Sequence, residues 1–80
     1  MTTLLSRGMP VVLVANQVYA VPSGSTQIAW QSAAGSDVLG SLDGVNFTSL
    51  GVSAANETKT VATSVAFIKS ATTPTVVTKR

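Results

Sequence analysis

The chain has 80 residues, which is enough for one small domain. Only 10% of the residues are charged, against roughly 25% in an ordinary soluble domain, while 45% are hydrophobic. The sequence has no His and no Cys, which excludes disulfides, the usual zinc and iron–sulfur ligand sets and any nucleophile activated by His. The net charge of +2 is too small to predict nucleic-acid binding, which needs a clustered basic face.

Small size and low charge together predict association with other subunits. A chain this short buries only about 60–65% of the surface that its unfolded form exposes. Few charges also weaken the repulsion that keeps proteins monomeric. We therefore expect a subunit of an assembly. A membrane span is not expected, because the longest apolar run, residues 9–15, is far shorter than the ~20 residues that a bilayer requires.

The first residues of the chain carry no clear hydrophobic period. We expect residues 1–8 to form an N-terminal arm and residues 9–80 to form the single domain. Leu4 and Leu5 in this arm have two possible roles: they pack against their own domain, or they extend to a partner as an apolar anchor.

The rest of the chain has the composition of a β protein, because Val and Thr are frequent and no long window has a helical period. The predicted strands cover residues 10–15, 18–21, 26–32, 37–42, 45–50, 58–63, 65–70 and 75–78. The segments 58–63 and 65–70 could instead form one long bent strand. Short strands at this spacing predict an all-β fold, a single antiparallel β-sandwich or barrel of about seven or eight strands.

Asp43-Gly44 is the strongest local signal in the sequence. An Asp-Gly pair between two alternating segments predicts a two-residue hairpin loop, since both central residues must adopt positive φ. Pro10 and Pro74 are expected to protect edge strands from pairing with other chains.

The four aromatic residues fall on four different predicted strands. Alternation along residues 26–32 places Trp30 with Ile28 on a buried face. We expect Tyr19, Trp30, Phe47 and Phe67 to contribute to the core between two sheets. The alternative is an exposed platform of Trp30 and Tyr19 on which a sugar could stack.

Catalytic activity is not expected from this chain. No cofactor, metal or small-molecule substrate is predicted. The three carboxylates, Asp37, Asp43 and Glu57, fall at strand ends or in turns, where solvated acids are common. The sequence therefore predicts a protein that is not an enzyme.

The segment Ser41–Leu50, with the sequence Ser-Leu-Asp-Gly-Val-Asn-Phe-Thr-Ser-Leu, resembles a hairpin of small β-sandwich proteins in tailed-phage virions. The Val-Pro-Ser-Gly-Ser-Thr turn before it and the closing Phe-Ile-Lys-Ser and Thr-Val-Val-Thr segments have the same order, so the resemblance covers roughly residues 10–80. It implies a structural virion protein. A chain of this length that starts with Met is most similar to a capsid decoration (cement) protein, which binds the outer capsid surface and stabilises neighbouring capsid subunits.

The resemblance also implies partners and a location. The expected partners are the major capsid protein and further copies of this chain, with a trimer at local three-fold axes, because symmetric partners match symmetric sites. Synthesis is expected in the host cytoplasm, and the final location is the capsid surface of the virion. We expect the contacts with a partner to involve Leu4, Leu5, Arg7, Lys79 and Arg80. The alternative for Lys79 and Arg80 is a solvated tail without a partner. The alternatives are a tail- or fibre-associated module that recognises surface glycans and another structural component of the tail or connector.

Overall fold

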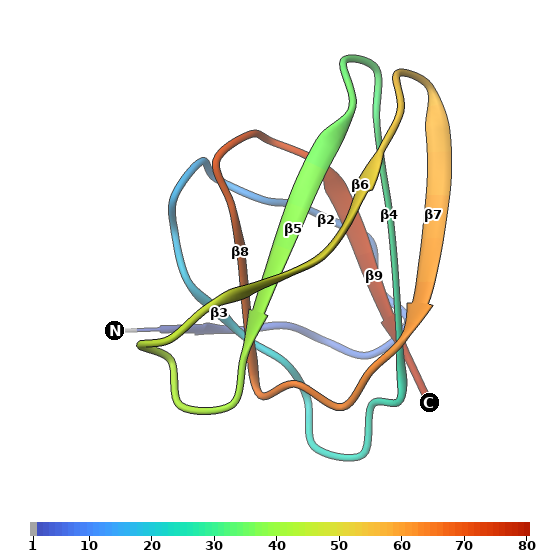
Figure 1. Ribbon diagram of the computed structural model, residues 1–80. Helices are drawn as coiled ribbons and strands as arrows, with labels where there is room; N and C mark the ends of the chain where they lie inside the picture. Colours follow the sequence, from blue (N-terminus) through green and yellow to red (C-terminus); the bar gives the residue numbers. More distant parts are fainter. Residues whose placement is uncertain (1) are drawn as a thin grey trace.

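The computed structural model describes residues 2–80, which form two β-sheets packed against each other (Figure 1). The predicted all-β fold is confirmed. No helix capable of crossing a membrane occurs in this described part of the chain. The strands β1 to β9 are, in order, Thr3–Leu4, Val11–Val12, Tyr19–Ala20, Gln27–Ser32, Ser36–Ser41, Thr48–Ser53, Glu57–Ala62, Phe67–Ser70 and Thr75–Lys79.

The two sheets are interwoven along the chain. The five-stranded sheet has the order β1-β3-β8-β5-β6, and the four-stranded sheet has the order β2-β9-β4-β7. Within residues 2–80, β5 and β6 are the only consecutive strands that share a sheet; every other connection crosses from one sheet to the other. Since β7 and β8 lie in different sheets, the segments 58–63 and 65–70 form two strands and not one bent strand.

The core lies between the sheets and is built by alternation along the strands. On β4, Ile28 and Trp30 point inward as predicted, and both are buried. The indole Nε1 of Trp30 donates a hydrogen bond to the main-chain oxygen of Ser36 on β5 at 3.3 Å, which links one sheet to the other. The buried hydrophobic residues are Leu5, Leu13, Tyr19, Val21, Ile28, Trp30, Val38, Ile68 and Val76.

Hydroxyl groups bond one another and the main chain at the start of β5 and the ends of β6 and β8. The Oγ of Ser53 accepts a hydrogen bond from the Ser36 amide at 3.1 Å, and Thr72 Oγ1 donates to Ser36 Oγ at 2.7 Å. Ser70 Oγ donates to the main-chain oxygen of Asp37 at 2.9 Å. Side-chain hydroxyls therefore bond main-chain groups of Ser36 and Asp37 at this end of the sandwich.

The aromatic residues only partly follow the prediction. Tyr19 and Trp30 are core residues with 4% and 1% of their surface exposed, so they cannot form the exposed platform considered above. Phe47 and Phe67 are half-buried and lie outside the core, contrary to prediction. On β8 the inward position belongs to Ile68, so alternation turns its neighbour Phe67 to the outer face.

The start of the chain also differs from the predicted arm. Thr3–Leu4 form β1, which pairs in parallel with β3, and the Leu5 amide donates to the oxygen of Ala20 at 2.9 Å. Leu5 is only 5% exposed and belongs to the core. Residues 2–8 are therefore part of the sandwich, whereas Met1 lies outside the described residues.

Candidate partner-binding loop

The connection between β5 and β6 is a six-residue loop, residues 42–47, at one end of the five-stranded sheet (Figure 1). The hairpin occurs where Asp43-Gly44 predicted one, but the predicted two-residue turn is wrong. That turn needs positive φ at both residues, and only Gly44 has it, at 79°. The pairing of β5 with β6 therefore ends at Gly40, which lies opposite Thr48.

The side chain of Asp43 fixes the path of this loop. Its Oδ1 accepts hydrogen bonds from the amides of Val45 and Asn46 at 2.8 and 2.9 Å, and its Oδ2 accepts one from Asn46 Nδ2 at 2.8 Å. Ser41 Oγ donates to Asp43 Oδ1 at 2.8 Å and accepts from the Gly44 amide at 2.9 Å. These bonds to the ionised form, the main-chain bond from Asn46 foremost, lower the pKa of Asp43 well below its ordinary value.

Two aromatic contacts hold the loop against the outer face of the five-stranded sheet. Gly44 lies on the ring of Phe67, so that a Cβ added to this glycine would stand 3.4 Å from ring carbons. At the other end of the loop, Lys69 Nζ lies 4.4 Å from the centroid of the Phe47 ring, which is a cation–π distance. The half-buried phenylalanines thus brace the loop and do not fill the core.

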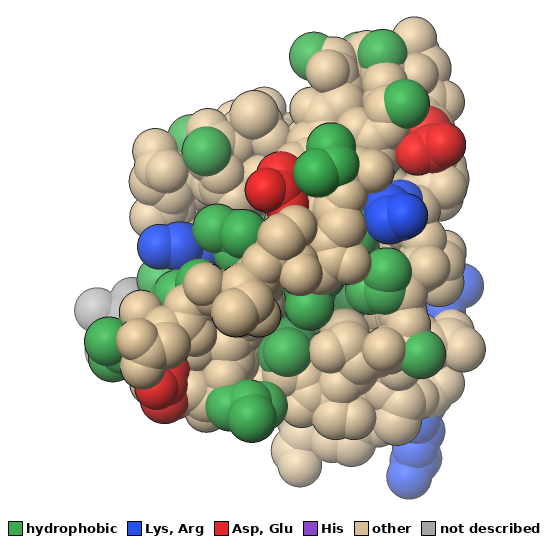
Figure 2. All heavy atoms as spheres, in the orientation of Figure 1, with side chains coloured by type: hydrophobic (Ala, Val, Ile, Leu, Met, Phe, Trp, Pro, Cys, Tyr) green, Lys and Arg blue, Asp and Glu red, His purple; other side chains and the backbone are tan. Residues whose placement is uncertain are grey.

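The braced loop carries two large hydrophobic side chains in solvent. Leu42 is 77% exposed and Val45 is 79% exposed. Figure 2 shows hydrophobic side chains on both sides of an acidic one over this loop. Because the main chain is already fixed by Asp43, a partner that covers Leu42 and Val45 would not have to order the loop first.

An open hollow lies between the loop and the connection from β7 to β8. It has a volume of about 540 Å³, and its apolar lining includes Leu42, Leu50 and Val65. Gly40 forms part of its floor, where an added Cβ would lie 2.9 Å from atoms of both Leu50 and Val65. The loop therefore presents exposed apolar side chains, and the hollow beside it has a partly apolar lining.

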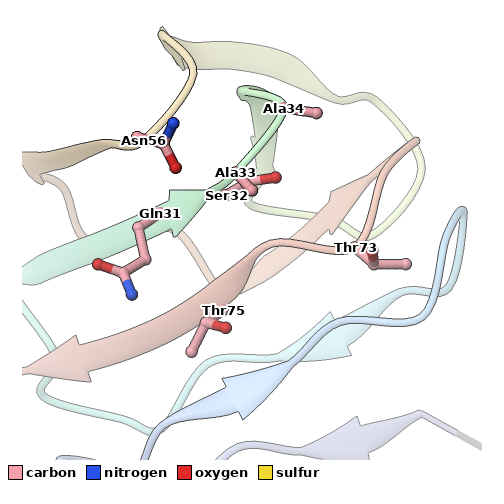
Figure 3. Close-up of a pocket in the computed structure, with 7 residues that line it drawn as sticks. All are labelled: Gln31, Ser32, Ala33, Ala34, Asn56, Thr73 and Thr75. Atoms are coloured by element: carbon pink, nitrogen blue, oxygen red, sulfur yellow. The ribbon is translucent and has the colours of Figure 1, made fainter.

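A second hollow, of about 570 Å³, is polar and uncharged (Figure 3). It is lined by Gln31, Ser32, Ala33, Ala34, Asn56, Thr73 and Thr75. Gln31 Oε1 already accepts a hydrogen bond from Thr58 Oγ1 at 3.0 Å. The lining offers hydrogen bonds but no titratable group, and residues 2–80 contain no cluster of acidic side chains that could hold a metal ion.

The residues predicted to contact a partner do not form one site. Leu4 is 67% exposed on β1, at an edge of the five-stranded sheet, whereas Leu5 is buried beside it. Burial removes Leu5 from the set of partner contacts, since its side chain already fills space in its own core.

The main chain next to Arg7 lies close to the end of β9, which leads to the other two predicted basic residues. The Arg7 guanidinium donates to the main-chain oxygen of Ser23. The Gly8 amide donates a hydrogen bond to the main-chain oxygen of Thr78 at 2.7 Å. The Thr26 amide donates one to the main-chain oxygen of Lys79 at 2.9 Å. These bonds bring Arg7 close to the end of β9, where Lys79 and Arg80 are exposed.

Sequence reasoning missed Leu42 and Val45 as candidate contacts, because it placed both on strands beside a tight turn. The signal for the loop is the spacing Ser-x-Asp-Gly-x-Asn, in which hydroxyl and carboxylate groups can bond main-chain amides two or three residues ahead. That spacing competes with the two-residue turn and favours a wider loop.

No family model, curated protein or solved structure matches this chain.

Proposed function

We propose that this chain is a structural protein without catalytic activity that docks onto a protein assembly through the 42–47 loop. The observation that carries this proposal is the exposure of Leu42 and Val45 on a main chain held in place by Asp43. Exposed apolar groups rimmed by polar residues are typical of a surface that a partner covers.

The assembly that we propose is a virus capsid, with the major capsid protein as the partner, because of the resemblance carried by Ser41–Leu50. The same ten residues contain the whole exposed loop. Burying one Leu or Val side chain completely contributes roughly 1.5–3 kcal/mol. The two side chains of the tip alone would therefore bind a capsid weakly. Contacts made by the adjoining hollow would add to this affinity. A capsid lattice with many equivalent sites would strengthen attachment further if neighbouring copies of the chain also contact one another.

The basic residues Arg7, Lys79 and Arg80 are proposed as a secondary contact for an acidic patch on a neighbouring subunit. Because exposed charge pairs contribute only about 0–1 kcal/mol each, we expect them to influence the rate of association more than its strength.

Binding to purified capsids that lack this chain tests the proposal. We expect the double variant Leu42→Ser/Val45→Ser to bind at least about tenfold more weakly than the wild type, which is roughly 1.4 kcal/mol. The matched control is Val12→Ser/Val52→Ser, which removes two side chains of similar exposure, both 62%, outside the loop. Exposed substitutions of this kind change stability by about 0.5 kcal/mol or less, so both variants should stay folded.

The control variant is expected to bind as the wild type does. Equal binding by both double variants would contradict the role of the loop. Failure of the wild type to bind capsids, combined with binding to glycans on an array, would favour the surface-recognition alternative.

A further inference from the structure

The four edges of the two sheets are protected to different degrees. β1 and β2 are two residues long, and Pro10 directly precedes β2. β6 is interrupted by a shift of register opposite Val38 and Leu39. β7, by contrast, pairs with β4 over six consecutive residues without a shift. Pro74, which was predicted to protect an edge, instead precedes the interior strand β9 and is buried.

The hydrogen-bonding pattern shows which groups of β7 face away from β4. The Thr63 amide donates to the oxygen of Thr26 at 3.0 Å, at the position of a hydrogen-bonded pair that continues the register between β4 and β7. Because such pairs alternate along an antiparallel ladder, Lys59 and Val61 also bond to β4. The amide and carbonyl groups of Thr58, Thr60 and Ala62 therefore point to the free side of β7, where Figure 1 shows no further strand.

We propose that β7 pairs antiparallel with β7 of a second copy of this chain, with Thr60 opposite Thr60 at a two-fold axis. In this register Thr58 lies opposite Ala62 of the second copy, and Ala62 lies opposite Thr58. All three residues with free main-chain groups then form hydrogen-bonded pairs, which gives about six new main-chain hydrogen bonds. The two four-stranded sheets become one continuous eight-stranded sheet.

The side chains of β7 suit pairing with a second copy. Thr58, Thr60 and Ala62 are exposed, small and uncharged, so no like charges meet on the outer face. On the inner face Lys59 lies opposite Val61 of the second copy and not opposite another Lys59. The aliphatic part of Lys59 packs across Gly51 of β6. Pairing about a two-fold axis uses the β7 edge of both chains, so no third chain can add there. It therefore predicts a dimer and not the trimer expected from the resemblance.

The variant Thr60→Pro tests this pairing. Proline at residue 60 removes an amide that does not bond to β4, so the ladder within the chain keeps its hydrogen bonds while pairing across the axis loses two. In sedimentation velocity, we expect the wild type to show a concentration-dependent monomer–dimer equilibrium and Thr60→Pro to remain a monomer. Circular dichroism checks that the variant is folded.

The variant Thr75→Lys is the matched control, because Thr75 is half-buried on the interior strand β9. It adds a charge to the outer face of the same sheet without touching the edge, so we expect it to dimerise like the wild type. Loss of the dimer in Thr75→Lys alone would overturn the edge pairing and favour a contact between sheet faces.

Hydrogen exchange of the wild-type chain gives an answer that does not depend on any variant. The amides of Thr58, Thr60 and Ala62 should exchange more slowly as protein concentration rises. A wild type that stays monomeric, or a dimer in which these amides gain no protection, would overturn the proposal. Neither result bears on the 42–47 loop, which is tested by capsid binding.

Discussion

Two neighbouring leucines near the N-terminus have opposite surroundings. Leu5 is 5% exposed in the core, and Leu4 is 67% exposed on the sheet edge. We expect Leu5→Ala to lower the free energy of unfolding by about 2–5 kcal/mol, because it leaves a cavity. Leu4→Ala should change it by about 0.5 kcal/mol or less. Chemical denaturation of both variants measures this difference. Equal effects would mean that the segment is not packed as described.

Thr78 carries a hydroxyl that the core does not satisfy. The residue is 1% exposed, and its Oγ1 has no hydrogen-bond partner. Val has nearly the same shape without the hydroxyl, so Thr78→Val should raise the free energy of unfolding by about 1 kcal/mol or more. Urea denaturation measures the change. A loss of stability would show that this hydroxyl has a partner after all, such as a buried water molecule.

At the scale of elements, strands were predicted correctly where buried and exposed residues alternate regularly. The prediction failed where a side chain bonds main-chain amides of a loop. The predicted strand 26–32 corresponds to β4 at Gln27–Ser32, with Ile28 and Trp30 inward as expected. The strand predicted at residues 45–50 begins three residues later, at Thr48, because Asp43 bonds amides of the loop. The turn propensity of Asp-Gly favours a two-residue turn there. This propensity takes no account of the hydrogen bonds that the Asp43 carboxylate makes with loop amides.

The lowered pKa of Asp43 leads to a prediction about acid. Its carboxylate stabilises the folded state fully above its ordinary pKa of 3.8, and this contribution is lost as pH falls through the lowered value in the folded state. Asp43→Asn has no carboxylate to titrate. We expect the difference in unfolding free energy between wild type and variant to be constant above about pH 5 and to shrink below about pH 4. A difference that stays constant throughout the acid range would contradict this role of Asp43.

At the scale of the whole molecule, Trp30 connects the two sheets. It is 1% exposed on β4, and its indole bonds to β5. Trp30→Ala should cost about 3–5 kcal/mol of stability, and Trp30→Phe should cost less, because the ring then fills most of the space. Circular dichroism during urea denaturation measures both variants. A stable Trp30→Ala variant would mean that this side chain is not the centre of the core.

The arrangement of strands in two sheets could not be derived from the sequence. Alternation indicates which side of a strand is buried but not which strand lies next to it. The chain changes sheet at nearly every connection, so neighbours in sequence such as β7 and β8 are seldom neighbours in a sheet. For the same reason the sequence could not show that Leu42 and Val45 are both exposed, or that β7 has a free edge.

We propose that a partner protein covers the exposed tip of the 42–47 loop. A reconstruction by electron cryo-microscopy of intact particles that contain the chain tests it most directly. We expect Leu42 and Val45 to be buried against a neighbouring protein, with the loop conformation unchanged. A reconstruction in which this loop faces solvent while another surface makes the contact would contradict the account.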